Sequence, residues 1–184
     1  AFEALGNCRF AGWDANGRPV GAPWNAERKV EISLLAVSED QTRNAFEPMK
    51  EMMGTEHLAA YYPGLEVMET RILLPFNGMI KPRTASAASF EGTPQVFTIA
   101  DQTETWLPNN GGVELVRVAK RNMSKTDGTL LEAPNAFVPG AGSFAELTWE
   151  AYQKAIAGDS FRDSIFYDTR DWGEPDLDDP NSVI

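Results

Sequence analysis

A short apolar segment that stops at a carboxylate is the feature that most constrains how this chain can fold. Residues 97–106 read FTIADQTETW, which is an apolar run of strand length followed directly by Asp101. A second apolar run, Thr129–Ala133, ends two residues before Asn135. Ligands of open α/β sheets bind outside the carboxyl ends of the strands. The two runs therefore predict an acid and an amide on one edge of a sheet.

Other segments predict a mainly parallel sheet with helices on both faces. Residues 30–37 (VEISLLAV) are β-prone and predict a buried strand. Gly112–Met123 has apolar residues on one helical face and basic residues on another. Such strands and helices in alternation are typical of a parallel α/β sheet. The remaining predicted elements are a hairpin within residues 7–24, a helix after Ser38, a hairpin over residues 71–84, a helix over residues 144–157 and a last strand over residues 164–167.

Composition narrows the classes of protein that the chain can belong to. Its 184 residues, 42% of them hydrophobic, suit one domain with a filled core. The net charge of −11 is the opposite of what an autonomous nucleic-acid binder carries. A single cysteine, Cys8, excludes an internal disulfide, and no apolar run approaches the length of a membrane span. The phosphate-loop pattern G-x-x-x-x-G-K-[ST] is absent from the sequence.

The acid after the first apolar run predicts a magnesium ligand. An apolar strand that ends in Asp is the Walker B pattern, in which the Asp holds Mg²⁺ through a water because Mg²⁺ keeps most of its hydration. A nearby side chain would then orient the attacking water. Gln102 and Glu104 are both candidates, and we favour Glu104 as the catalytic carboxylate with Gln102 contacting the γ-phosphate or the water. The alternative is that Asp101 only caps a strand end.

Two further polar residues follow predicted strands. Ser38 lies at the end of the strand over residues 30–37, and Asn135 follows Thr129–Ala133. An amide can donate to a phosphate oxygen and accept from a water, so Asn135 is a candidate γ-phosphate sensor. Ser38 is a candidate for the same edge. The structural alternatives are a helix N-cap for Ser38 and an Asx turn for Asn135.

A basic stripe on the predicted helix Gly112–Met123 has two interpretations. Arg117, Lys120 and Arg121 lie on one side of this helix. The favoured interpretation is a solvated helix face. The other is a contact with DNA or phosphate, or an Arg finger that acts in trans.

Taken together, these segments resemble the N-terminal ATPase domain of the large terminase subunit of tailed bacteriophages. Four stretches carry the resemblance in the family's order, and together they cover most of the chain after residue 30. They are LLAVSEDQTRNAF (34–46), ADQTETWLPNNGG (100–112), RNMSKTDGTLLEAPNAFVPGAGSFAE (121–146) and IFYDTRDWGEPDLDD (165–179).

The resemblance implies a three-layer P-loop NTPase core of the RecA/helicase-like (ASCE) type. It implies an ATPase that binds ATP and Mg²⁺ and drives viral DNA through a portal into a procapsid. Asp101 would be the Walker B aspartate. Asn135 would lie in the coupling motif, which reads Ala133-Pro134-Asn135 here and Thr-Thr-Asn or Ser-Thr-Asn in the family. The implied partners are double-stranded DNA, the portal protein, the small terminase subunit and further copies of the protein in a ring. The implied location is the cytoplasm of the infected bacterium, and no membrane partner is implied.

The same resemblance predicts the domain organisation. Residues 1–170 would be a partial ATPase domain that lacks its phosphate-loop strand at the N-terminal side. Residues 171–184 are acidic and would form a linker toward a nuclease domain. The isolated chain is then expected to be inactive. The alternatives are a fragment of a helicase-like P-loop ATPase and a non-catalytic α/β interaction domain of a phage protein.

Overall fold

The computed structural model describes residues 5, 8–23, 30–84, 95–126, 128–158 and 165–168. The chain divides into two compact units, Ala1–Leu147 and Thr148–Ile184. The first contains every strand of the described segments, and the second contains most of helix α5 (Phe144–Ile156) and residues 165–168. The acidic stretch over residues 171–184 lies outside the described residues.

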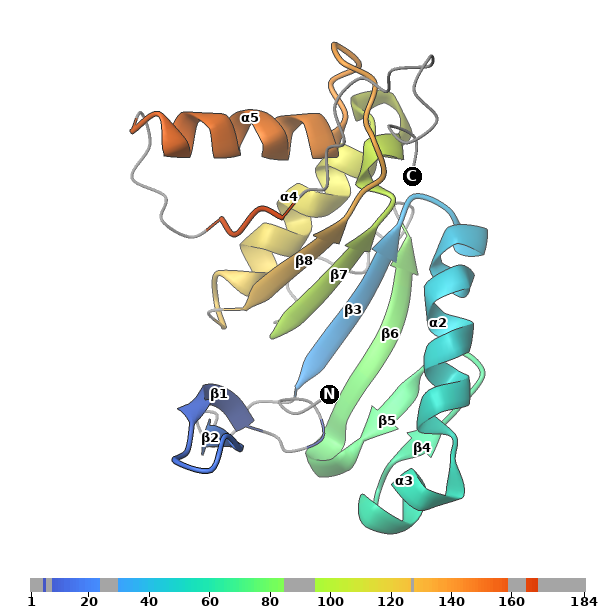
Figure 1. The fold of residues 1–184 in the computed structure, drawn as a ribbon. Coiled ribbons are helices and arrows are strands. Elements are labelled where there is room, and N and C mark those ends of the chain that lie inside the picture. The colour runs from blue at the N-terminus through green and yellow to red at the C-terminus, as the bar shows by residue number, and fades with distance from the viewer. Residues whose placement is uncertain are drawn as a thin grey trace, which may run out of the picture. The chain divides into compact units, whose positions relative to one another are not determined.

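A six-stranded sheet in the order β4-β5-β6-β3-β7-β8 forms the centre of the first unit (Figure 1). Four neighbouring strands pair in parallel, and the two strands at one end are added by antiparallel pairing, β5 with β6 and β4 with β5. The predicted mainly parallel α/β sheet is therefore confirmed. The parallel strands are β6 (Gly78–Thr84), β3 (Glu31–Ala36), β7 (Phe97–Asp101) and β8 (Thr129–Ala133), and the antiparallel ones are β5 (Ile72–Leu74) and β4 (Glu66–Val67).

Helices cover both faces of this sheet, as the sequence predicts. Successive residues of a strand point to opposite faces, and β3 shows this with two leucines. Leu34 joins a core cluster with Phe46 of α2 (Glu39–Met53). Leu35 joins a second cluster with Leu115 of α4 (Gly112–Met123). Helix, sheet and helix therefore form three layers.

The central and edge strands of the sheet differ in burial. From Ile32 to Ala36, every residue of β3 is buried. Strand β8 alternates between exposed and half-buried residues, and Leu131 keeps 50% of its surface exposed. Within the described segments β8 pairs only with β7. The outer edge of β8 therefore offers backbone groups and apolar surface that no described strand covers.

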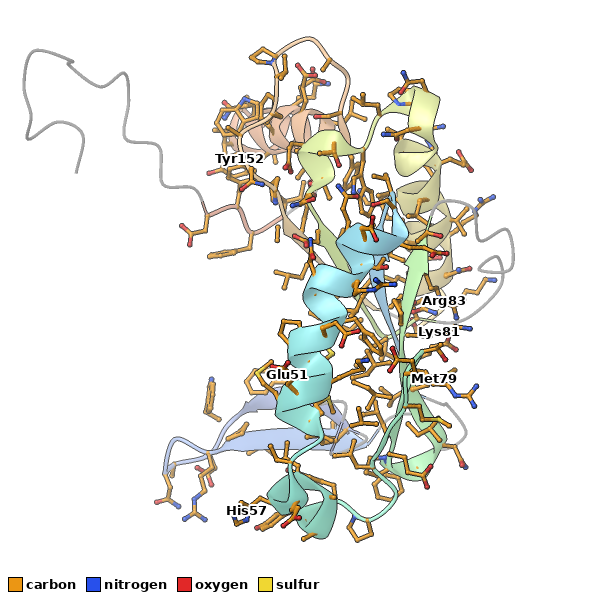
Figure 2. All side chains as sticks on the ribbon, turned by 90° about the vertical axis from the view of Figure 1, so that its right-hand side faces the viewer. Glu51, His57, Met79, Lys81, Arg83 and Tyr152 are labelled. Atoms are coloured by element: carbon orange, nitrogen blue, oxygen red, sulfur yellow. The ribbon has the colours of Figure 1, made fainter. Side chains whose placement is uncertain are left out.

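A buried cluster of polar side chains lies inside the sheet, on the face that α4 also covers. Met79, Lys81 and Arg83 follow one another along one side of β6 (Figure 2). Arg83 forms an ion pair with Glu31. Its Nε donates to the Ser33 hydroxyl at 3.1 Å, which donates to Gln95 Oε1 at 2.7 Å. We call Glu31, Ser33, Arg83 and Gln95 the buried cluster. Since Ser33 and Gln95 are fully buried, these bonds replace water that the side chains lose on folding.

The loop after β7 is fixed by a buried aromatic ring. Trp106 is fully buried, and its ring stacks on Phe144 with 6.4 Å between centroids. A Cβ atom on Gly112 would lie 2.5 Å from Trp106 Cβ, so the start of α4 packs against this side chain only with glycine at position 112. Two short 3₁₀ helices, Thr103–Thr105 and Pro108–Asn110, complete the connection between β7 and α4.

Most other predicted elements are also present. The hairpin predicted within residues 7–24 consists of β1 (Cys8–Trp13) and β2 (Pro19–Pro23), and β5 and β6 form the one predicted over residues 71–84. A short helix, α3 (Glu56–Tyr61), follows α2. Among the helices of the described segments, none is both long enough and apolar enough to cross a bilayer.

The predicted last strand over residues 164–167 is wrong for the residues that the structure describes there. Residues 165–168 form no strand. Instead, the Tyr167 ring stacks on Tyr152 of α5 with 4.7 Å between centroids, and it lies 5.3 Å from the ring of Trp149. Aromatic side chains are frequent in strands, but here they pack against a helix.

Candidate functional site

Asp101 is the last residue of β7, at the carboxyl edge of the parallel strands. It lies beside Ala133, the last residue of β8, and the preceding residue Ala100 lies beside Leu35 of β3. Its side chain is half-buried, and no hydrogen bond or ion pair joins it to another described residue. Because a free carboxylate oxygen is a ligand that Mg²⁺ accepts, Asp101 fits the predicted metal role.

The chain turns sharply directly after Asp101. Gln102 has φ +54° and ψ +46°, in the left-handed region that residues other than glycine rarely adopt. The 3₁₀ helix Thr103–Thr105 begins at once. As a result, side chains 102, 103 and 104 no longer follow the alternation of the strand.

Three successive residues of this turn are hydrogen-bonded to β8 and the loop after it. The Gln102 N–H donates to Ala133 O at 3.0 Å. The hydroxyl of Thr103, which is fully buried, donates to Glu132 Oε1 at 2.6 Å. Glu104 makes the third connection. The turn and the end of β8 therefore have fixed positions relative to each other.

Glu104 and Asn135 are in direct contact. The backbone N–H of Asn135 donates to one Glu104 carboxylate oxygen at 3.0 Å, and its Nδ2 donates to the other at 2.9 Å. The structure thus joins two candidate residues that are 31 positions apart in the sequence. Each carboxylate oxygen keeps a further lone pair that can accept a proton donor. We call Asp101, Gln102, Glu104 and Asn135 the edge cluster.

Helix α2 reaches the edge cluster with its first turn. Ser38 is the N-cap of α2, and its hydroxyl accepts the Gln41 N–H at 3.3 Å, so its capping role is confirmed. The Gln41 side chain donates from Nε2 to Gln102 Oε1 at 2.8 Å. Sequence analysis did not assign Gln41 to the site, because nothing in the sequence signals a bond that spans 61 positions.

The basic stripe has partners on its own surface. Arg117 and Arg121 both lie near the Glu114 carboxylate, at 3.4 Å and 3.7 Å, and their side chains stay 71% and 59% exposed. The Lys120 ammonium lies 4.8 Å from the centroid of the Phe144 ring. These contacts fit a solvated helix face. A contact of the three residues with DNA or phosphate stays a prediction.

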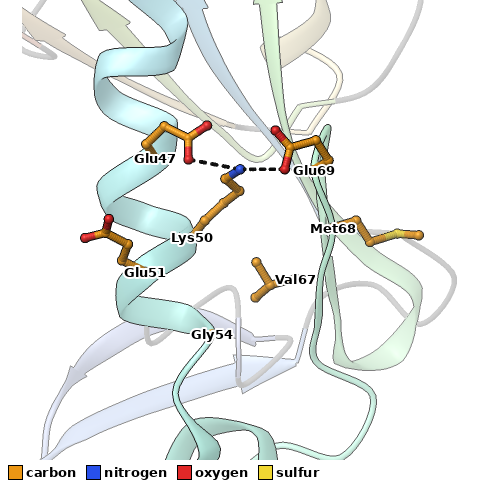
Figure 3. Close-up of a pocket in the computed structure, with 7 residues that line it drawn as sticks. All are labelled: Glu47, Lys50, Glu51, Gly54, Val67, Met68 and Glu69. Carbon is orange, nitrogen blue, oxygen red and sulfur yellow. Dashed lines mark hydrogen bonds and ion pairs between the residues drawn. The ribbon is translucent and has the colours of Figure 1, made fainter.

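A shallow cavity of about 390 Å³ lies elsewhere, beside the C-terminal half of α2 (Figure 3). Lys50 bridges Glu47 and Glu69 there, with both N–O distances at 3.0 Å. The hydrogen bonds that the Lys50 ammonium donates to Glu47 and to Glu69 raise the pKa of Lys50 above its ordinary value. None of the predicted site residues lines this cavity. Its lining consists of Glu47, Lys50, Glu51, Gly54, Val67, Met68 and Glu69.

The donor set at the sheet edge fits a metal shared with a nucleotide. Among the described residues, no three His, Cys, Asp or Glu side chains converge as a cluster that could hold a metal ion. Mg²⁺ is commonly bound by one or two carboxylates, substrate phosphates and several waters. The Asp101 carboxylate alone therefore provides a sufficient protein ligand of this kind.

Comparison with known proteins gives relatives from two phages. No family model matches the chain. The Gene 13 protein of Mycobacterium phage L5 is 36% identical over 188 aligned residues, and that of Mycobacterium phage D29 is 31% identical. Each alignment covers 99% of this chain and 30% of the relative. The chain therefore spans less than a third of the length of these proteins.

Solved structures with a similar fold are large terminases. The crystal structure of the HK97 bacteriophage large terminase aligns with a TM-score of 0.52, at 15% identity, over 73% of this chain and 27% of the terminase. The ATPase domain of the Thermus phage P74-26 large terminase aligns with a TM-score of 0.46, at 20% identity, over 60% of this chain and 50% of that one. The HK97 alignment confirms the resemblance to large terminases at the level of the fold.

Proposed function

We propose that this chain belongs to the ATPase region of a phage large terminase and hydrolyses ATP to drive DNA packaging. The observation that carries the proposal is the edge cluster. Asp101 is the last residue of β7, and Glu104 follows it in the next turn. Glu104 is hydrogen-bonded to Asn135, which follows the adjacent parallel strand β8. A fold shared with the HK97 large terminase supports the same assignment.

Asp101 would hold Mg²⁺ together with ATP phosphates. When bound, Mg²⁺ would neutralise charge on the phosphate oxygens. The half-buried position of Asp101 limits its solvation by bulk water, and its carboxylate has no competing partner among the described residues. Both properties favour a ligand over a structural cap.

Glu104 would orient the attacking water. Its carboxylate is held in one orientation by the two bonds from Asn135, and each oxygen can still accept a water O–H. An oriented acceptor lowers the entropy cost of reaching the transition state. Asn135 would thereby connect the water-orienting group to the loop after β8. A nucleotide-dependent movement of Glu104 would then be transmitted to this loop.

In P-loop ATPases a backbone loop with the pattern G-x-x-x-x-G-K-[ST] holds the phosphates, and this pattern is absent from the 184 residues. We propose that a strand from outside this sequence pairs with the outer edge of β8 and brings that loop beside Asp101. The curated relatives are more than three times longer than the aligned region, so such a strand has room in a protein of their length. Double-stranded DNA, the portal protein, the small terminase subunit and further copies of the motor are proposed partners, in the cytoplasm of the infected bacterium.

The test is ATP hydrolysis by the full-length gene product, with the 184-residue chain beside it. We expect Mg²⁺-dependent phosphate release by the full-length protein, stimulated by double-stranded DNA, and none by the chain alone. Hydrolysis without any response to DNA would favour another class of P-loop ATPase. No hydrolysis under any condition would overturn the proposal and favour a non-catalytic α/β interaction domain.

A further inference from the structure

We propose that Gln41 is a positioning residue that directs the amide nitrogen of Gln102 toward the phosphates of a bound nucleotide, an inference that rests on the proposed ATPase function. The observation is the 2.8 Å hydrogen bond from Gln41 Nε2 to Gln102 Oε1. It connects the first turn of α2 to the residue directly after Asp101.

The polarity of the Gln102 amide follows from this bond. A glutamine side chain offers an oxygen acceptor on one side and an NH₂ donor on the other. The hydrogen bond from Gln41 Nε2 uses the oxygen of Gln102. The Gln102 Nε2 makes no hydrogen bond to a described residue, and it is not among the buried polar atoms left unpaired. Gln102 therefore presents a donor to its surroundings, which suits a phosphate oxygen and not a water proton.

The unpaired oxygen of Gln41 supports this orientation. Gln41 Oε1 is buried and has no partner among the described residues. If both side-chain amides were rotated by 180°, the NH₂ group of Gln41 would take the buried position of its oxygen. Its N–H donors would then lack acceptors, whereas in the observed arrangement only one oxygen lacks a donor. Orphaned buried N–H groups are rarer than under-satisfied carbonyl oxygens. The observed arrangement is therefore the less costly one.

The backbones of Gln41 and Gln102 are both held in place by further hydrogen bonds. The Gln41 backbone N–H is bound by the capping hydroxyl of Ser38, in a helix anchored in the core through Phe46. The Gln102 N–H is bound to Ala133 O, and its carbonyl accepts the hydroxyl of Thr105 at 2.8 Å. Neither backbone can follow a change in the other side chain, so the amide contact itself sets the direction of the Gln102 side chain.

A division of roles follows for the two residues that the sequence left as alternatives. Gln102 acts as a donor to a phosphate oxygen, and Glu104 remains the acceptor that can orient a water. The nucleotide-contacting role of Gln102 then depends on α2, an element that carries no residue of the edge cluster.

The test compares Gln41→Met with Gln102→Ala in the full-length gene product. Methionine keeps the length of the side chain and cannot make the bond. We expect Gln41→Met to raise KM for ATP about 3–10-fold, the effect of one lost hydrogen bond, with kcat nearly unchanged because the contact is made before and during the reaction. Gln41→Met should add nothing in a Gln102→Ala background, since Gln41 acts through Gln102. Asn44→Met, on the exposed side of the same helix, is the matched control and should leave KM unchanged.

An equal rise of KM in the wild-type and Gln102→Ala backgrounds would overturn the proposal, as would an unchanged KM in Gln41→Met. A second measurement separates this inference from the proposed function. In the ¹⁵N-labelled 184-residue chain, Gln41→Met should shift the Gln102 side-chain amide signal, and Asn44→Met should not. An unmoved signal overturns the positioning role even if the protein is an ATPase. A moved signal without any ATP hydrolysis supports the contact and overturns the ligand assigned to Gln102.

Discussion

The sheet carries two polar clusters, and they differ in what surrounds them. In the buried cluster, Arg83 retains 8% of its exposure and Ser33 none, and the bonds connect β6, β3 and Gln95, which lies two positions before β7. In the edge cluster, Glu104 is half-buried and Asn135 exposed, and the bonds run between loops. Both clusters contain a glutamate and a glutamine, but the edge cluster is the one with an exposed member.

This difference separates stability from chemistry. A buried charge that loses its partner cannot recover its hydration, so the buried cluster should contribute to the free energy of unfolding. Side chains of the edge cluster can exchange protein partners for water at little cost. Substitutions there should leave the fold intact and change the reaction.

The largest effect is expected from Glu104→Gln. This change keeps the shape of the side chain and removes the carboxylate that accepts the water proton. Turnover of ATP by the full-length gene product should fall about 10²–10⁴-fold, the usual range for a lost general base. Nucleotide affinity and the urea unfolding midpoint should stay close to those of the wild type. Normal turnover in Glu104→Gln together with none in Gln102→Ala would reverse the two roles.

The buried cluster should respond in the opposite way to Glu31→Gln. Loss of the charge-assisted bond to Arg83 should lower the free energy of unfolding by about 1.5–3 kcal/mol. Urea denaturation of the 184-residue chain measures this. The double variant Glu31→Gln/Arg83→Met should lose less than the sum of the single variants, because it removes both charges. A change in turnover per folded molecule would break the distinction between the clusters.

A smaller effect is expected from Asn135→Ala. The substitution removes the Nδ2 donor and leaves the backbone N–H that also holds Glu104. Turnover should therefore fall about 10-fold, as for one lost hydrogen bond to a charged group. Steady-state kinetics of the full-length gene product would show it, with Asn109→Ala in the exposed 3₁₀ helix as control. A loss as large as that of Glu104→Gln would mean that Asn135 contacts the nucleotide directly.

The smallest effect is expected at Lys50, outside both clusters. Lys50→Met should lower the melting temperature slightly, and less in high salt, because exposed ion pairs are weak and screened. Its partners raise the pKa of Lys50 above its ordinary value, so the stabilisation is present below the pKa of the unfolded chain and is lost as pH rises through the folded pKa. Wild type and variant should therefore differ at neutral pH and converge once the pH has risen through the folded pKa of Lys50. A difference that persists there would mean that packing, and not charge, connects α2 to β4.

The sequence predicts the strands and helices well where periodicity and length agree. β8 and α4 lie at their predicted bounds, and the nearly continuous apolar run of β3 agrees with its burial on both faces. The strand predicted over residues 164–167 is wrong at the described residues 165–167, because aromatic side chains suit strands and helix surfaces equally. The periodicity of a sequence cannot show whether such side chains pair in a sheet or pack on a helix unless the packing partner is known.

Within the site, the sequence could place residues at strand ends but could not pair them. Asp101 and Asn135 follow from the rule on carboxyl ends, whereas the Glu104–Asn135 bond depends on the left-handed conformation of Gln102. That conformation is unusual for glutamine, and nothing local in the sequence signals it. The contact from Gln41 to Gln102 is also set by the packing of α2 and could not be read from spacing.

The proposed catalytic role of the sheet edge depends on Asp101, and Mg²⁺-dependent ATP turnover by the Asp101→Asn variant of the full-length gene product measures it. The change is isosteric and replaces a carboxylate oxygen with an amide, which is a poorer Mg²⁺ ligand. Turnover should be lost while the thermal unfolding midpoint remains that of the wild type, because the Asp101 side chain has no partner among the described residues. Robust Mg²⁺-dependent turnover in Asp101→Asn would contradict the claim that the carboxyl edge of this sheet is the site of catalysis.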